Sequence, residues 1–165
     1  MNNHRLSDFG KLSLRFEEGE TAEPYQDKAG FWTVGVGHKI LPNESYKNLK
    51  KSDIDKLFDK DILDREVELN RGLEIELYPH QFDAIFILCF NIGVGSFFSS
   101  SIYKFLKTPD KISAFQYWKK WNKITDPETG KKKVCKSLVS RRAREINLFI
   151  NNLTDINDYI NFKEN

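Results

Sequence analysis

The sequence contains few cysteines and histidines, and this limits the chemistry it can support. Two cysteines in 165 residues are too few for a disulfide scaffold or a zinc site. Cys89 lies in an apolar run at residues 84–90 and is typical of a core thiol, and neither it nor Cys135 has a histidine at catalytic spacing. The three histidines are scattered and form no pair with metal-ligand spacing. We therefore expect no catalytic cysteine and no metal.

Long apolar runs are also missing. No stretch approaches the roughly 18 uninterrupted apolar residues of a membrane span. Residues 1–10 lack the apolar core of a secretory signal. We expect a protein made in the cytoplasm without a signal peptide or membrane span. Action in the periplasm or cell wall would then depend on release or export by other means.

The charge is unevenly distributed, although the net charge is only +2. Residues 101–150 hold 13 lysines and arginines against 4 aspartates and glutamates, a net charge of +9. Residues 1–100 hold 12 against 17, a net charge of −5. A basic segment of this kind suits a polyanionic partner, either peptidoglycan with its anionic polymers or nucleic acid. A solvated basic face, or attraction between the two halves, gives the same pattern.

The first part of the chain predicts one helix followed by a small sheet. Aromatic residues make up 13% of the sequence, so a packed core is expected. Apolar residues at helical spacing, Leu12 among them, predict a helix over residues 8–18. Glycines and a proline exclude a helix over residues 22–39, where β-branched and aromatic residues favour strands. Residues 27–30 have the composition of a hairpin turn.

The rest of the chain predicts helices. Apolar spacing predicts a helix over residues 52–70, with a capping box formed by Ser52 and Asp55. Pro79 suits a first helical position, and residues 82–91 are apolar almost all round, which is typical of a buried central helix. Shorter helices are expected at residues 100–107, 109–121 and 139–151, and an exposed loop at residues 126–133. The predicted fold class is α+β.

Three residues near the first helix carry the groups that glycoside hydrolysis requires. Inversion needs an acid for the leaving oxygen and a base that guides water to the opposite face, with the two carboxyls about 6.5–9.5 Å apart. Glu18 ends the predicted helix, Asp27 lies at the hairpin turn, and Thr33 follows on the next strand. The Thr33 hydroxyl can hold water without adding charge. The other nearby acidic residues are expected on a solvated face: Glu17, Glu20 and Glu23.

Several short segments occur in a characteristic order along the chain. They are residues 18–19, 25–27, 30–33, 35–38, 81–84, 90–93 and 138–142, together with Glu145 and Phe149. Together they resemble the signature of the phage lysozymes of glycoside hydrolase family 24, the T-even and lambdoid endolysins. The resemblance spans most of residues 12–150.

This resemblance implies one lysozyme-like domain over residues 1–165. A small sheet-containing lobe (about 12–50) would be joined by a connecting helix (52–70) to a helical lobe. That lobe would consist of residues 79–165 and the N-terminal helix. We expect a monomer that binds peptidoglycan glycan strands and does not bind nucleic acid.

The resemblance also implies an activity without a cofactor. The family's muramidases cut the β-1,4 bond between N-acetylmuramic acid and N-acetylglucosamine with inversion. Carried over by position, Glu18 matches the catalytic acid, and Asp27 and Thr33 match the pair that positions water.

Four residues are predicted to contact the substrate: Phe31, His38, Asn91 and Arg141. Asn91 falls where the family lines the cleft from the C-terminal lobe. A histidine that ends a strand is more often a hydrogen-bonded core residue, so both interpretations stand for His38.

Two arginines match basic residues that face the catalytic helix in the family. Arg141 and Arg144 are three residues apart and therefore share a helix face. We expect Arg141 to contact Glu18 and Arg144 to contact Glu17. The alternative is that these arginines face only solvent or substrate, because surface ion pairs are weak.

Two other functions compete with a muramidase. A lytic transglycosylase closes its sugar on itself and needs no water-positioning pair. A non-catalytic module that binds cell wall or nucleic acid through the basic segment predicts salt-sensitive binding without turnover. A muramidase of this kind would act either as a phage endolysin dependent on a holin or as an antibacterial effector with an immunity protein.

Overall fold

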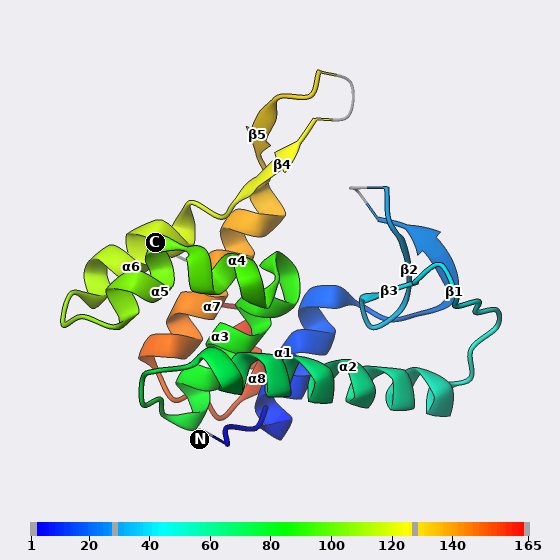
Figure 1. The fold of residues 1–165 in the computed structure, drawn as a ribbon, viewed down its shortest axis with the longest axis horizontal. Coiled ribbons are helices and arrows are strands. Elements are labelled where there is room, and N and C mark those ends of the chain that lie inside the picture. Colours follow the sequence, from blue (N-terminus) through cyan, green and yellow to red (C-terminus); the bar gives the residue numbers. More distant parts are fainter. Residues whose placement is uncertain (1–2, 28–29, 127–128, 164–165) are drawn as a thin grey trace.

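The computed structural model describes residues 3–27, 30–126 and 129–163. A small sheet lies toward one end of the long helix α2, and the other helices gather around its other end (Figure 1). The helices are α1 (Asp8–Glu18), α2 (Lys51–Gly72), α3 (Pro79–Ile92), α4 (Val94–Ser99), α5 (Ser101–Leu106), α6 (Lys111–Lys119), α7 (Lys136–Ile150) and α8 (Ile156–Ile160). The strands are β1 (Thr21–Gln26), β2 (Trp32–Gly35), β3 (His38–Lys39), β4 (Lys123–Thr125) and β5 (Lys132–Val134). The predicted α+β class is confirmed.

Helix α1 has the bounds predicted from the sequence. It begins after Ser7, whose hydroxyl oxygen accepts a hydrogen bond from the backbone N–H of Gly10. It ends at Gly19, whose φ of +71° suits a residue without a Cβ atom. Glu18 is therefore the last helical residue, directly before the chain turns toward the sheet.

Strands β1, β2 and β3 form an antiparallel sheet in that order. Tyr25 pairs with Thr33, and β3 pairs with the other edge of β2, so Thr33 lies on the central strand. Two residues of the predicted turn, 28 and 29, lie outside the described residues. On either side of them the backbone N–H of Phe31 donates to Asp27 Oδ1 at 2.9 Å, and that of Asp27 donates to the Phe31 carbonyl at 2.9 Å. These bonds hold Asp27 at the end of β1.

Helix α3 forms the centre of the hydrophobic core, as its all-round apolar sequence predicts. Its residues 82–90 are all buried, Pro79 is its first residue, and Gly93 ends it. Helix α7 is its main packing partner, and α1, α2 and α4 also contact it.

Helix α2 connects the sheet to the helical core. It contacts β2 and β3, and it also contacts α3 and α4. Its first turn corrects a prediction, because Lys50 caps it without a side-chain bond and the capping box of Ser52 and Asp55 is absent. The Asp55 carboxylate instead accepts hydrogen bonds from Lys51 and Arg15. Within the described ranges, none of the helices combines the length and apolar character that crossing a membrane requires.

Two further predictions need correction. Leu12 of α1 is exposed, and Leu14 is fully buried in its place, because the buried face of the helix runs through Gly10, Ser13 and Leu14. The sequence reading also missed α4 and α8, which are too short to show a helical period clearly.

The predicted loop at residues 126–133 belongs to a hairpin. Strands β4 and β5 pair antiparallel, with Lys123 opposite Val134 and Thr125 opposite Lys132. Residues 127 and 128 of the predicted turn lie outside the described residues. The hairpin extends away from the helices (Figure 1), and every residue of β5 is exposed. It therefore presents lysines to the solvent.

Candidate active site

Glu18 lies where α1, the sheet, α3 and α7 meet. Its Oε1 atom is 2.8 Å from Nη2 of Arg141 on α7, and its side chain is 17% exposed. Gly37, in the turn between β2 and β3, lies so close that a Cβ atom there would be 2.9 Å from Glu18 Oε2. The same Cβ atom would be 3.2 Å from the ring of Phe90 on α3. Glu18 is thus held at a junction of four elements and still reaches solvent.

Tyr25 of β1 lies near both predicted carboxylates. Tyr25 is 41% exposed, but its partial burial raises its pKa, and the negative charges of Glu18 and Asp27 raise it further. The charge of Glu18, at the end of α1, and that of Asp27, just after β1, therefore both act on the Tyr25 phenol. Tyr25 is also paired with Thr33, and opposite residues of an antiparallel pair project from the same face. The three residues predicted from the sequence lie around this tyrosine.

Asp27 and Thr33 are oriented by the backbone between β1 and β2. Asp27 Oδ1 accepts the backbone N–H of Phe31, and the Thr33 hydroxyl donates to the carbonyl of Phe31 at 3.3 Å. Thr33 is buried and Asp27 is partly exposed. Since both side chains bond to one residue, their positions relative to each other are restricted.

The two predicted ion pairs between α1 and α7 are both present. Besides the pair of Arg141 with Glu18, Arg144 binds both oxygens of Glu17, with Nε 2.7 Å from Oε1 and Nη2 2.9 Å from Oε2. The Tyr159 hydroxyl on α8 donates to the same Oε1 at 3.0 Å. The expectation of a solvated face is therefore wrong for Glu17, because two-pronged pairing and a third donor compensate its burial.

Glu145 of α7 joins the arginines, and the sequence reading gave it no role. Its Oε1 accepts Nε of Arg141 at 3.0 Å and Nη2 of Arg142 at 2.7 Å. Its Oε2 accepts the indole N–H of Trp118 at 2.8 Å. Arg142 Nη2 also donates to Asn91 Oδ1 at 3.1 Å. The available signal was the spacing of three and four residues between the arginines and Glu145, which places them on one helix face.

The residues predicted to contact substrate lie in different settings. Asn91 is exposed near the end of α3, and Phe31 is exposed beside β2 with the Lys39 ammonium 4.3 Å from its ring centre. Arg141 is buried and engaged with Glu18, so it is placed to hold the acid and not to face solvent. Asn91 and Phe31 remain accessible to a ligand.

His38 is a buried, hydrogen-bonded residue. Its Nδ1 lies 2.9 Å from Asp61 Oδ2 on α2, and its Nε2 lies 3.0 Å from Glu44 Oε2. The Asp61 hydrogen bond raises the pKa of His38 against the opposing effect of burial, and Glu44 also raises it. The structure supports the core interpretation of His38. We do not assign it to the substrate site, because both ring nitrogens are engaged.

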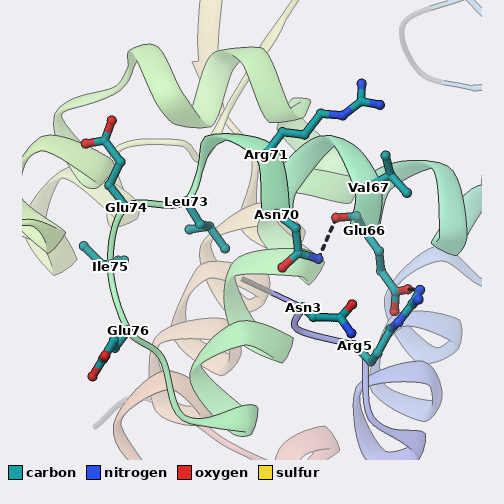
Figure 2. Close-up of a pocket in the computed structure, with 10 residues that line it drawn as sticks. All are labelled: Asn3, Arg5, Glu66, Val67, Asn70, Arg71, Leu73, Glu74, Ile75 and Glu76. Carbon is teal, nitrogen blue, oxygen red and sulfur yellow. Dashed lines mark hydrogen bonds and ion pairs between the residues drawn. The ribbon is translucent and has the colours of Figure 1, made fainter. Parts of the chain in front are cut away.

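A surface pocket of about 600 Å³ lies beside the C-terminal end of α2 (Figure 2). It is bordered by Asn3 and Arg5 of the N-terminal segment, by Glu66 of α2, and by Glu74 beyond it. Arg5 pairs with Glu66 at 2.6 Å. Within the part of the chain that the structure describes, the residues lining this pocket include none of those predicted for the site. We place the candidate site at Glu18, near Tyr25, which feels the charges of Glu18 and Asp27 and pairs with Thr33 on the neighbouring strand.

A carboxylic acid that ends a helix and faces a small antiparallel sheet beside a helical core is the arrangement expected of a lysozyme-like glycoside hydrolase. Comparison with known proteins identifies the family. Residues 15–145 match the model of the phage lysozyme family. The chain belongs to this family.

Individual relatives extend the match over most of the chain. The chain is 31% identical over 144 residues to an endolysin of Acyrthosiphon pisum secondary endosymbiont phage 1, covering 87% of this chain and 97% of that protein. It is 31% identical over 153 residues to the endolysin of Salmonella phage P22, covering 88% and 98%. The solved muramidase domain of SpmX from Asticaccaulis excentricus superposes with a TM-score of 0.78 at 28% identity, covering 90% and 99%. The solved endolysin from Escherichia coli O157:H7 phage FAHEc1 superposes with a TM-score of 0.82 at 24% identity. The match covers 93% of this chain and 98% of that one, and it shows the shared fold.

Proposed function

We propose that the chain is a muramidase that hydrolyses the β-1,4 bond between N-acetylmuramic acid and N-acetylglucosamine in peptidoglycan, with inversion. Glu18 protonates the bridging oxygen. Asp27 and Thr33 hold the attacking water on the opposite face of the sugar ring. The observation that carries this proposal is the placement of Glu18 at the end of α1, opposite a sheet that presents Asp27 and Thr33 around Tyr25.

The environment of each group suits its role. Glu18 is held by Arg141 and packed against Gly37, so its carboxyl has a restricted orientation, while partial exposure leaves room for a sugar. Asp27 can accept a proton or orient water, and Thr33 adds a neutral hydroxyl beside it. Restricting the reacting groups in this way supplies much of an enzyme's rate through orientation.

Substrate contacts are proposed for the two accessible residues. Asn91 supplies an amide from the helical side, and Phe31 supplies an aromatic ring from the sheet side. Aromatic rings pack against the apolar faces of sugars, and amides bond their hydroxyl and acetamido groups.

The proposed setting is the bacterial cell wall, reached from the cytoplasm. The relatives described above include endolysins of phages, and others are described as SAR-endolysins of phages P21 and Mu. These names support a phage endolysin, and holin-dependent release is the route to peptidoglycan that we propose for it. A holin gene next to its own gene is the expected observation. A neighbouring immunity gene would instead indicate an exported antibacterial effector.

The test of activity uses purified sacculi and three proteins: wild type, Glu18→Gln and Glu20→Gln. Wild type should clear the suspension, and Glu18→Gln should lose a factor of about 10² to 10⁴ in rate, as expected for removing a general acid. Glu20→Gln is the matched control, because Glu20 is a nearby carboxylate that pairs with Lys51. Equal clearing by wild type and Glu18→Gln, or binding without clearing by all three, would refute the proposal.

A further inference from the structure

A buried cluster of charges lies behind the candidate site, and Glu145 is at its centre. The Glu145 side chain is 0% exposed, and its Oε1 accepts hydrogen bonds from both Arg141 and Arg142. Arg141 is the residue that contacts Glu18, and Arg142 is the residue that binds Asn91. One carboxylate therefore connects the supports of two site residues from different helices.

The position of Glu145 bears on a difficulty in the proposed chemistry. An arginine next to a carboxyl favours its ionised form, whereas a general acid must keep its proton until the reaction. Arg141 cannot lose its own charge, because the charges of Glu18 and Glu145 raise its pKa and outweigh the effect of burial. Its positive charge is, however, shared with Glu145 at 3.0 Å. Sharing weakens the hold of Arg141 on ionised Glu18.

We infer that Glu145 is a positioning residue for the reaction: it fixes Arg141 against Glu18, partly neutralises that arginine, and orients Asn91 through Arg142. This inference rests on the proposed function. Glu145 does not touch the substrate in this account. It acts only through the two arginines.

Glu18 faces Arg141 on α7, and the phenol of Tyr25 on β1 feels the charges of Glu18 and Asp27. The charge of Glu17, which precedes Glu18 in the chain, is neutralised by Arg144.

Around Glu145, the charge partners are the two arginines on its own helix. Trp118 on α6 donates a neutral hydrogen bond to it. The buried Cys89 thiol on α3 and the Tyr159 phenol on α8 also feel the charge of Glu145, and burial together with that charge raises the pKa of both, so they stay neutral. Of these neighbours, the arginines are thus the charges that balance Glu145.

Two substitutions should move the pH–rate profile in opposite directions. Glu145→Gln leaves Arg141 with Glu18 as its carboxylate partner, so the alkaline limb of the profile for kcat should move to lower pH by about one unit. Arg142→Met removes a positive charge, and Glu145 then pairs with Arg141 alone. Because Arg141 is more fully neutralised, it stabilises ionised Glu18 less, and the same limb should move to higher pH. Arg142→Met should also raise KM severalfold, because Asn91 loses its support.

Folding of the variants is a separate question. Arg142 is 1% exposed, and its Nε and Nη1 atoms bond to none of the residues that the structure describes, so Met at this position should be accommodated. Glu145→Gln leaves two buried guanidinium groups with less compensation and should unfold at a lower temperature. If Glu145→Gln does not fold, the Arg142→Met variant alone tests the inference. A shift of its alkaline limb to higher pH supports the inference, and no shift or a shift to lower pH overturns it.

The matched control is Glu66→Gln on α2. Glu66 is a buried carboxylate that pairs with Arg5 at 2.6 Å and accepts the backbone N–H of Leu6, at the pocket in Figure 2. This variant should lose stability without moving the pH–rate profile. Unchanged alkaline limbs in folded Glu145→Gln and Arg142→Met, or shifts of the same sign, would overturn the inference. An active Glu18→Gln variant would instead overturn the proposed function, so the two failures are distinguishable.

Discussion

Gly37 lies directly against the carboxylate of Glu18. A Cβ atom at this position would be 2.9 Å from Glu18 Oε2, closer than non-bonded carbon and oxygen atoms approach, and the φ of Gly37 is +69°. The turn between β2 and β3 therefore forms one wall around the proposed acid, and glycine is the residue that fits there.

Substitution of this glycine should damage activity more than stability. Gly37→Ala should displace the Glu18 carboxyl and reduce the hydrolysis rate on the order of 10²-fold, because small misplacements of reacting groups are costly. The matched control is Gly35→Ala. Gly35 has a similar φ of +64°, but its Cβ atom would make an ordinary 3.7 Å contact with Ile54. Both variants should lose about 1–2 kcal/mol of unfolding free energy from backbone strain. Equal rates for the two would contradict the proposed role of this contact.

Thr33→Ala should separate catalysis from folding. The Thr33 hydroxyl makes one long hydrogen bond to the Phe31 carbonyl, so its loss should cost no more than about 1 kcal/mol of stability. Loss of the water-holding group should lower the rate of reducing-end release by about 10²-fold. Phe86→Ala in the core of α3 gives the contrast, with a loss of about 3–5 kcal/mol and full specific activity in the folded fraction. An unfolded Thr33→Ala protein, or one with full activity, would refute the assignment.

His38 should make the stability depend on pH. The Asp61 hydrogen bond raises the folded-state pKa of His38 above its unfolded value of about 6.5. The folded protein therefore holds this proton more tightly. The resulting stabilisation is complete below about pH 6.5 and is lost as the pH rises through the folded-state value. Urea unfolding of wild type and His38→Gln from pH 5.5 to 8.5 measures this difference.

In that experiment wild type should lose more stability with rising pH than His38→Gln does. His80 supplies a control of opposite sign, because burial lowers its pKa and its contribution is lost as the pH falls. Parallel stability curves for wild type and His38→Gln would show that the bonds of His38 to Asp61 and Glu44 do not favour the protonated form.

The basic hairpin should contribute to wall binding. Replacing Lys131, Lys132 and Lys133 with Gln removes three exposed positive charges from the hairpin. Binding to sacculi should weaken severalfold at low ionic strength, and the difference should shrink in salt, because salt screens exposed charges. The control is a triple replacement of Lys47, Lys56 and Lys60 with Gln. These lysines are also exposed, but they belong to residues 1–100, whose net charge is negative. Equal weakening by both triple variants would mean that only the net charge matters.

Much of the fold was predictable because the local signals were strong. The bounds of α1 follow from its apolar spacing and from Gly19, and the burial of α3 follows from an apolar sequence on every side. Strands β4 and β5 were missed, since a lysine-rich segment has no apolar alternation and the hairpin is held by its own backbone pairing. The capping box at Ser52 failed because Asp55 found stronger partners in Lys51 and Arg15.

The sequence and the family resemblance proposed the residues of the candidate site, but they indicated only some of the contacts that support them. The family resemblance, together with the three-residue spacing on α7, was enough to predict the contacts of Arg141 and Arg144 with α1. The burial of Glu17 was not predictable from an acidic segment, because it depends on Tyr159 reaching it from α8. The partners of His38 come from α2 and from the segment before it, so no local pattern could indicate them.

The most direct test of the central claim is the configuration of the first product. When wild-type protein digests a soluble glycan fragment inside an NMR tube, inversion predicts that the new reducing end on N-acetylmuramic acid appears first as the α-anomer. Water delivered by Asp27 and Thr33 to the face opposite Glu18 gives this result. A β-anomer formed first, or a 1,6-anhydro end with no reducing sugar, would contradict the account.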